Sequence, residues 1–138
     1  MMRFRERAAS DRGAVAVEFA LILPLLLMIL VGTIEFGRVY SQVQVYNGAA
    51  REGARCAAVM ASSFGECDTV GDVQAKINDT SDPYADPPAA TITPAAGCTD
   101  LDVGEPVNVS WSQPLQIDIP FWKDVTVNTT IEATFRCE

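Results

Sequence analysis

The chain has 138 residues, enough for one domain with a modest core and an appended segment. Its 10 Lys and Arg against 18 Asp and Glu give a net charge of −8, and this acidic balance disfavours nucleic acid as a partner, because the phosphate backbone binds basic faces. The sequence has no histidine and no Gly-rich phosphate loop. It therefore predicts neither an enzyme nor a cofactor.

The first 34 residues contain a basic leader followed by an apolar run. Residues 1–13 hold four Arg against two acids, a net of +2, which leaves 6 basic and 16 acidic residues, a net of −10, in the rest of the chain. The apolar run from Ala14 to Ile34 has 21 residues, which at ~1.5 Å per residue are long enough to cross a bilayer as a helix. The charge asymmetry predicts a cytoplasmic N-terminus and a body outside the membrane.

Three interpretations compete for this N-terminal segment: a cleaved secretory signal, a permanent anchor, and a prepilin-type leader. The cleaved signal fits worst, because the apolar run is too long and Glu-Phe-Gly-Arg follows it in place of small residues. The other two remain open on composition alone.

Glu18 lies five residues into the apolar run. A charge at the bilayer centre costs roughly 2.5 to 3.5 kcal/mol, whereas the thirteen Leu, Ile, Val and Phe residues contribute roughly 0.3 to 0.6 kcal/mol each, a sum of roughly 6 kcal/mol that outweighs this cost, so the helix should still insert. The acid either has a functional partner or reaches the headgroups near Arg12. Pro24, farther along the run, predicts a kink or a loosened turn.

Three strings carry a family resemblance: RGAVAVEFALILPLLL, IEFGRVY and NGAAREGAR. Their order resembles the TadE-like family, the minor pseudopilins of Tad (Flp-type) pilus systems within the type IV pilin superfamily. The resemblance covers about residues 12 to 58, a third of the chain. The residues that match are Gly13, Glu18, Phe19, Pro24, Glu35-Phe36-Gly37 and Ala50-Arg51-Glu52.

The resemblance implies processing by an inner-membrane prepilin peptidase, which would cleave between Gly13 and Ala14. The new amine of Ala14 is then the partner of Glu18; in related pilins it is thought to come from a neighbouring subunit. The implied function is a minor pseudopilin in Tad-type (type IVc) pilus assembly, adhesion or secretion. Its implied partners are the peptidase, other pilins and pseudopilins, the Tad inner-membrane machinery and membrane lipid, in the bacterial inner membrane.

A second function class remains beside this one: a single-pass anchored binding module that never enters a pilus, in which Glu18 is incidental and the outer domain recognises a ligand.

The helical pattern continues past Ile34. One stripe of residues recurs at steps of three and four, and beside it lies an i, i+4 row of small residues. Such a row packs either against a sheet of the same molecule or against neighbouring helices in an assembly; we favour packing within the molecule for residues 45–61. The helix is expected to end at Ser62-Ser63-Phe64-Gly65. The stripe is Val39, Val43, Tyr46, Ala50, Gly53 and Ala57, and the row is Ala49, Gly53, Ala57 and Ala61.

Four cysteines, Cys56, Cys67, Cys98 and Cys137, all follow the apolar run. An even number outside the membrane predicts two disulfides, and zinc is disfavoured because the chain has no C-x-x-C pair and no histidine. Four cysteines allow three connectivities, and the sequence leaves these open, with a slight preference for Cys67–Cys98 and Cys56–Cys137.

The outer domain contains a short helix at 72–78 that Asp72 would cap, and a possible strand at 90–93 within a Pro-rich loop. Alternation predicts strands at 107–111 and at 125–137. In the second strand it places on one, largely apolar, face the residues Val125, Val127, Thr129, Ile131, Ala133, Phe135 and Cys137.

Between these strands, the prolines of QPLQIDIPFWKD are expected to interrupt any central strand. The tip, Phe121-Trp122, either closes over the core or docks on a partner or membrane surface. The acids of DTSDPYAD lack EF-hand spacing, which favours a solvated loop over a calcium site.

Together these patterns predict an α+β, pilin-like fold, in which a long N-terminal helix, its first half transmembrane, packs on a small antiparallel sheet. The expected parts are a leader (1–13), a transmembrane helix (14–34), its outer continuation (35–62) and a disulfide-linked α+β domain (63–138).

Overall fold

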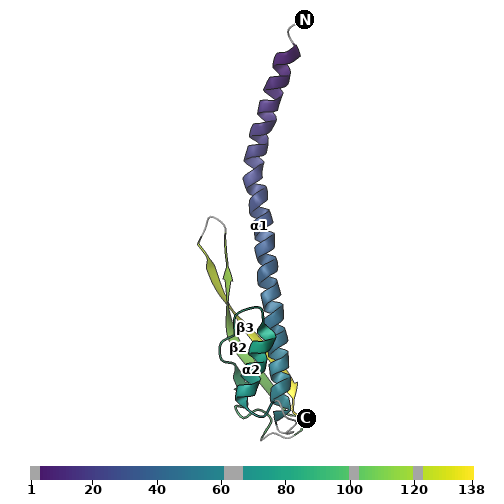
Figure 1. The fold of residues 1–138 in the computed structure, drawn as a ribbon, viewed down its shortest axis with the longest axis vertical. Helices are drawn as coiled ribbons and strands as arrows, with labels where there is room; N and C mark the ends of the chain where they lie inside the picture. Colours follow the sequence, from purple (N-terminus) through teal and green to yellow (C-terminus); the bar gives the residue numbers. More distant parts are fainter. Residues whose placement is uncertain (1–3, 61–66, 100–102, 120–122) are drawn as a thin grey trace.

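The computed structural model describes residues 4–60, 67–99, 103–119 and 123–138, with side chains from Gly13 onward. A long helix, α1 (Phe4–Ala58), packs with its C-terminal part on a three-stranded antiparallel sheet, as Figure 1 shows. This is the predicted α+β arrangement. The start of α1 and the C-terminus lie at opposite ends of the molecule.

The N-terminal half of α1 has no cover from the rest of the chain. Its apolar side chains are exposed, for example Leu21 (76%) and Met28 (65%). The stretch Gly13–Ala58 is long and apolar enough to cross a membrane, with a mean hydropathy of 2.7 in its most apolar window. One such helix near the N-terminus is consistent with a single-pass membrane protein. The helix continues through Pro24 without a break (Figure 1).

The C-terminal part of α1 forms the core with the other elements. The predicted stripe points inward: Tyr46, Ala50, Gly53 and Ala57 are buried, and Val39 and Val43 are partly buried. The predicted helix end at residues 62–65 lies outside the described residues, and α1 itself ends at Ala58.

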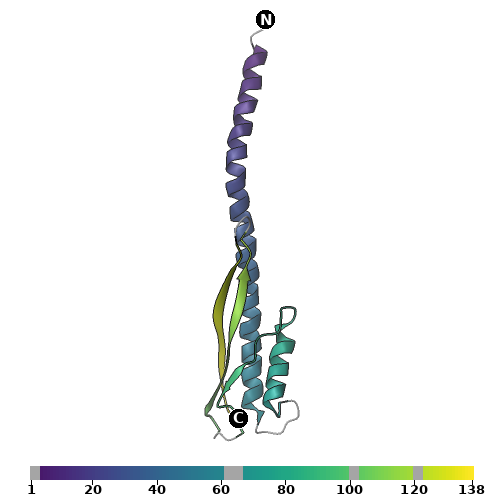
Figure 2. The ribbon, with the colours of Figure 1, turned by 90° about the vertical axis from the view of Figure 1, so that its left-hand side faces the viewer.

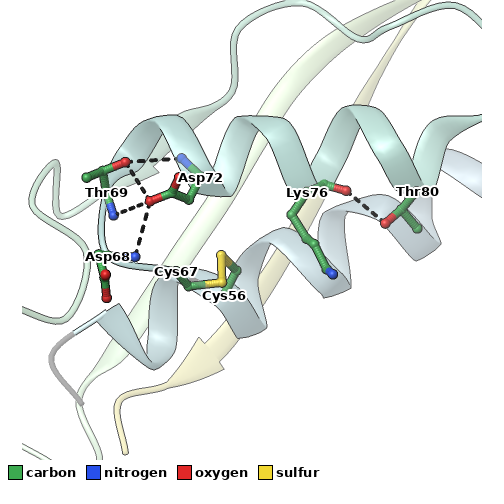
Figure 3. The surroundings of a disulfide bond; sticks show 7 residues. All are labelled: Cys56, Cys67, Asp68, Thr69, Asp72, Lys76 and Thr80. Carbon is green, nitrogen blue, oxygen red and sulfur yellow. Dashed lines mark hydrogen bonds between the residues drawn. A yellow bond between two sulfur atoms is a disulfide. The ribbon is translucent and has the colours of Figure 1, made fainter. Parts of the chain in front are cut away.

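A second helix, α2 (Val70–Ser81), runs alongside α1 (Figure 2). The prediction that Asp72 caps it is wrong: Thr69 is the N-cap, and Asp72 completes a capping box from the third helical position. The Thr69 side chain accepts from the Asp72 amide, and the Asp72 carboxylate accepts from the Thr69 amide at 2.8 Å (Figure 3). A hydroxyl and a carboxylate three residues apart satisfy two free amides, and this reciprocity starts the helix two residues earlier than expected.

The row of small residues lets α1 and α2 approach closely. A Cβ added to Gly53 would lie 2.5 Å from Cγ1 of Ile77, and Ile77 is fully buried. Ala49 and Ala57 of the same row are also fully buried, so the row packs within the molecule as favoured, although Gly53 contacts α2 rather than the sheet. Ala61 lies outside the described residues.

The sheet has the order β1 (Thr91–Thr93), β2 (Pro106–Ile117), β3 (Val125–Arg136). The expectation that proline interrupts the central strand is wrong, because β2 runs through Pro114, which pairs with Asn128. β1 pairs only with residues 108–110, so the other edge of β2 has no strand partner at Pro114 within the described part of the chain. Proline is tolerated there because no ladder hydrogen bond needs its missing amide.

Two disulfides join Cys56 to Cys67 and Cys98 to Cys137, and no described cysteine is free. The predicted number is confirmed, but the preferred pairing is wrong. The first disulfide ties the end of α1 to the start of α2 (Figure 3), whereas the second ties the chain after β1 to the chain after β3. Cys137 is buried and its bond is internal, as the alternation of the last strand predicts.

The alternation in residues 125–137 predicts that one whole face of β3 is buried, and this prediction is wrong. Only Ile131 of β3 is buried, whereas Val125 (42%), Val127 (44%) and Phe135 (39%) are exposed. Val125 and Val127 lie near the far end of the β2–β3 hairpin, which extends along α1 toward its N-terminal half, beyond the end of α2 (Figures 1 and 2). Phe135 lies at the opposite end of β3, where it pairs with Val107, and nothing in the structure explains its exposure.

Candidate functional site

The predicted processing residues lie on the uncovered part of α1. Gly13, Ala14, Glu18 and Phe19 are helical and exposed. Glu18 has no hydrogen bond or ion pair with any described residue. The structure therefore leaves the proposed cleavage position and the acid accessible, and brings no described side chain to Glu18.

Glu18 and Glu35 are the acids at the two ends of the apolar stretch. No charged residue occurs between them, and 17 residues at ~1.5 Å each separate them by roughly 26 Å along the helix. The hydrocarbon core of a bilayer is roughly 30 Å thick. When one acid lies near one boundary of the hydrocarbon core, the other therefore lies near the opposite boundary.

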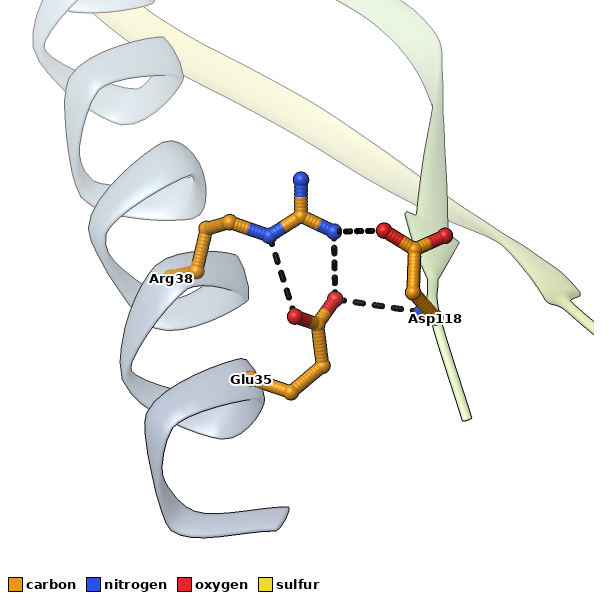
Figure 4. Close-up of polar contacts among 3 residues, drawn as sticks. All are labelled: Glu35, Arg38 and Asp118. Carbon is orange, nitrogen blue, oxygen red and sulfur yellow. Dashed lines mark hydrogen bonds and ion pairs between the residues drawn. The ribbon is translucent and has the colours of Figure 1, made fainter. Parts of the chain in front are cut away.

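Glu35 belongs to a cluster that joins α1 to the end of β2, shown in Figure 4. Arg38, one turn along α1, donates to both carboxylate oxygens of Glu35, with Nε at 3.1 Å from Oε2. The same guanidinium donates to Asp118 Oδ2 at 2.6 Å, and the Asp118 amide donates to Glu35 Oε1 at 3.1 Å. Two acids and one base thus connect positions 80 residues apart in sequence.

The cluster perturbs the titration of Glu35, which lies just outside the predicted membrane segment. The Arg38 guanidinium, and then the Asp118 amide, hold the pKa of Glu35 below its ordinary value by donating to its carboxylate. Each donor favours the charged acid. Glu35 is therefore ionised in the intact cluster at neutral pH and carries the hydrogen bonds that attach the strand end.

A groove of about 510 Å³ lies beside this cluster, between α1 and the end of β2. Most of its lining is apolar, and the two acids of the cluster stand at its edge. On α1 the lining starts inside the predicted membrane segment and ends beyond it. The lining residues are Met28, Gly32, Glu35, Phe36, Val39, Ile117, Asp118 and Ile119.

The remaining family motif residues have different environments. Phe36 is 74% exposed and stacks on Tyr40 at 6.4 Å between ring centroids, and a side chain added at Gly37 would meet nothing within 4 Å. Ala50 is fully buried, whereas Arg51 is exposed. Phe36 therefore exposes an aromatic ring beside the Glu35–Arg38–Asp118 cluster, whereas Ala50 is part of the hydrophobic core.

Sequence reasoning named Glu35 but missed its partners Arg38 and Asp118. The i, i+3 spacing of Glu35 and Arg38 on a helix was a usable signal. Nothing in the local sequence of Asp118 indicates its contact with α1. No described group of three His, Cys, Asp or Glu residues could hold a metal ion. The predicted aromatic tip, Phe121-Trp122, lies outside the described residues.

One segment of the chain matches a known protein family. Residues 13–55, about a third of the chain, match a family model described as TadE-like protein. This confirms the resemblance read from the sequence motifs. The match begins at Gly13, so the basic leader is outside it. No curated protein and no solved structure gives a match.

Proposed function

We propose, from the TadE-like segment at residues 13–55, that the chain is a minor pseudopilin with a structural role in the assembly of a Tad-type pilus or related secretion system. The observation that carries the proposal is this match on a helix whose apolar half is exposed and can cross a membrane. The proposed role is non-catalytic: the chain offers surfaces for other pilins and for the assembly machinery.

In this proposal, prepilin peptidase removes residues 1–13 and leaves Ala14 as the N-terminus. The α-amino group of Ala14, with a reference pKa near ~8, is then cationic at neutral pH. Ala14 and Glu18 are four residues apart on α1 and so share a helix face. A paired charge costs far less than an unpaired one in a low-dielectric setting, so Glu18 favours docking that brings an amine to it.

Processing is tested by the intact mass of the protein from cells with and without the prepilin peptidase. We expect the chain to lose its first 13 residues only when the peptidase is present. A Gly13→Leu variant should stay uncleaved, whereas Gly48→Leu, at an exposed position on the same helix, should be cleaved normally. An N-terminus at Met1 in both strains would contradict the proposal and favour the anchored binding module.

The role of Glu18 is tested separately from cleavage. A Glu18→Gln variant should be processed as the parent is, yet enter assemblies poorly, because the amide cannot neutralise an ammonium. Glu132→Gln, on the exposed side of β3, is the matched control and should assemble normally. Normal assembly of Glu18→Gln would remove the ion pair from the proposal while leaving processing intact.

A further inference from the structure

We infer that the groove between α1 and the end of β2 binds one acyl chain of a zwitterionic phospholipid from the outer leaflet. The inference depends on the membrane helix and is independent of the proposed role in pilus assembly. Met28, Gly32 and Phe36 of α1 form one wall of the groove, and Ile117 and Ile119 form the other.

The position of the groove along α1 places it at the membrane boundary. Met28 and Gly32 belong to the apolar stretch that ends at Ile34, and Phe36 and Val39 lie beyond it. The groove therefore extends from the part of α1 predicted to lie in the membrane to the part beyond it. An acyl chain already in the leaflet reaches it without crossing water.

The groove is long and narrow enough in its lining to follow a single chain. It runs beside α1 from Met28 to Val39, a span of ~16 Å, and has a volume of about 510 Å³, which holds a large part of one acyl chain.

The wall that β2 contributes is apolar and incompletely covered. Ile119 is 40% exposed, although Arg38 and the Asp118 carboxylate hold the strand end beside α1. An exposed isoleucine next to a membrane-crossing helix gains from burial in hydrocarbon. Gly32 leaves the opposite wall open, since a side chain added there would meet no atom within 4 Å.

The charged residues beside the groove favour a zwitterionic lipid headgroup over an anionic one. Glu35, Arg38 and Asp118 sum to −1, and residues 14–138 carry a net of −10. An anionic headgroup would be repelled by both. A zwitterionic headgroup presents an ammonium that the two carboxylates attract, and phosphatidylethanolamine is therefore the probe of choice.

The test uses the full chain in nanodiscs of phosphatidylethanolamine that contain a trace of phospholipid with a photoreactive diazirine on its acyl chain. After irradiation, labelled residues are mapped by mass spectrometry. We expect label on Ile117 or Ile119 as well as on the membrane helix. Gly32→Leu should lower the label on β2 several-fold, because the new side chain fills the groove, and leave the label on Leu25 and Leu26 unchanged.

Gly37→Leu is the matched control. It makes the same change of residue on the same helix, meets no atom within 4 Å, and lies outside the groove lining, so it should label as the parent does. Absence of label on Ile117 and Ile119, or label there that Gly32→Leu leaves unchanged, would overturn the site. Equal or stronger labelling in phosphatidylglycerol nanodiscs would overturn the headgroup assignment.

A second arm separates lipid from protein as the occupant. A photoreactive phenylalanine analogue replaces Ile119, and the adducts are separated by mass. Adducts one phospholipid heavier than the chain are the expected result. Covalent dimers as the main adduct would show that a second copy fills the groove, and would overturn the proposal.

Discussion

The Arg38 guanidinium on α1 lies 2.6 Å from the Asp118 carboxylate at the end of β2, and this ion pair ties the hairpin to the helix just beyond the predicted membrane segment. Both side chains are about half exposed, at 43% and 58%. Exposed ion pairs contribute little to global stability. Their role here is local, because they set where the last residues of β2 lie relative to α1.

Arg38→Met should therefore release the strand end and leave the rest of the fold intact. We expect faster amide hydrogen exchange in residues 115–119, with little change in the free energy of unfolding. Arg51→Met, at an exposed position with no partner among the described residues, is the control. Unchanged exchange near Asp118 in Arg38→Met would show that other contacts hold the hairpin.

The same attachment should depend on pH. The folded-state pKa of Glu35 is lowered, so its contribution is present above the ordinary value of 4.5 and is lost as the pH falls through the lower, folded value. The amide of Asp118 donates to Glu35 and reports this titration by NMR. Its midpoint should lie below 4.5, and Arg38→Met should raise it. A midpoint at or above 4.5 in the parent would contradict the cluster.

The two disulfides should differ in their effect on stability. Their sequence separations of 11 and 39 residues predict losses of about 3 and about 4 kcal/mol on removal, since the longer loop restricts the unfolded chain more. The double variants Cys56→Ala/Cys67→Ala and Cys98→Ala/Cys137→Ala, unfolded in urea, measure this order. A larger loss from the first pair would mean that native packing outweighs loop entropy.

Contact between the two helices at Gly53 should be sensitive to size. Gly53→Leu forces a side chain against buried Ile77 and should lower the free energy of unfolding by about 1 to 3 kcal/mol. Gly48→Leu, whose added side chain meets nothing within 4 Å, should instead raise it by up to about 1 kcal/mol through helix propensity. Equal effects at both positions would contradict close packing of α2 on Gly53.

Local patterns predicted much of the fold because they act over one element at a time. The periodicity of α1, the alternation of β2 and the even number of cysteines all indicate what each segment buries. The errors arose where a partner from elsewhere decides. The pattern in residues 72–78 predicts Asp72 as the N-cap, because Thr69 lies outside that range. The sequence predicts a strand break at Pro114, because it does not indicate that β1 pairs only with residues 108–110.

Several features could be predicted from the sequence alone: a helix able to cross a membrane, the position of Glu18 within it, the TadE-like segment, the α+β class and the presence of two disulfides. These follow from composition, spacing and periodicity along a continuous chain. Other features depend on the folded arrangement: which cysteines pair, how much of β3 is buried, and the contact of Asp118 with Glu35 and Arg38 beside an apolar groove. Those features join residues separated by up to 83 positions, and the sequence around each residue does not indicate which distant residue it contacts.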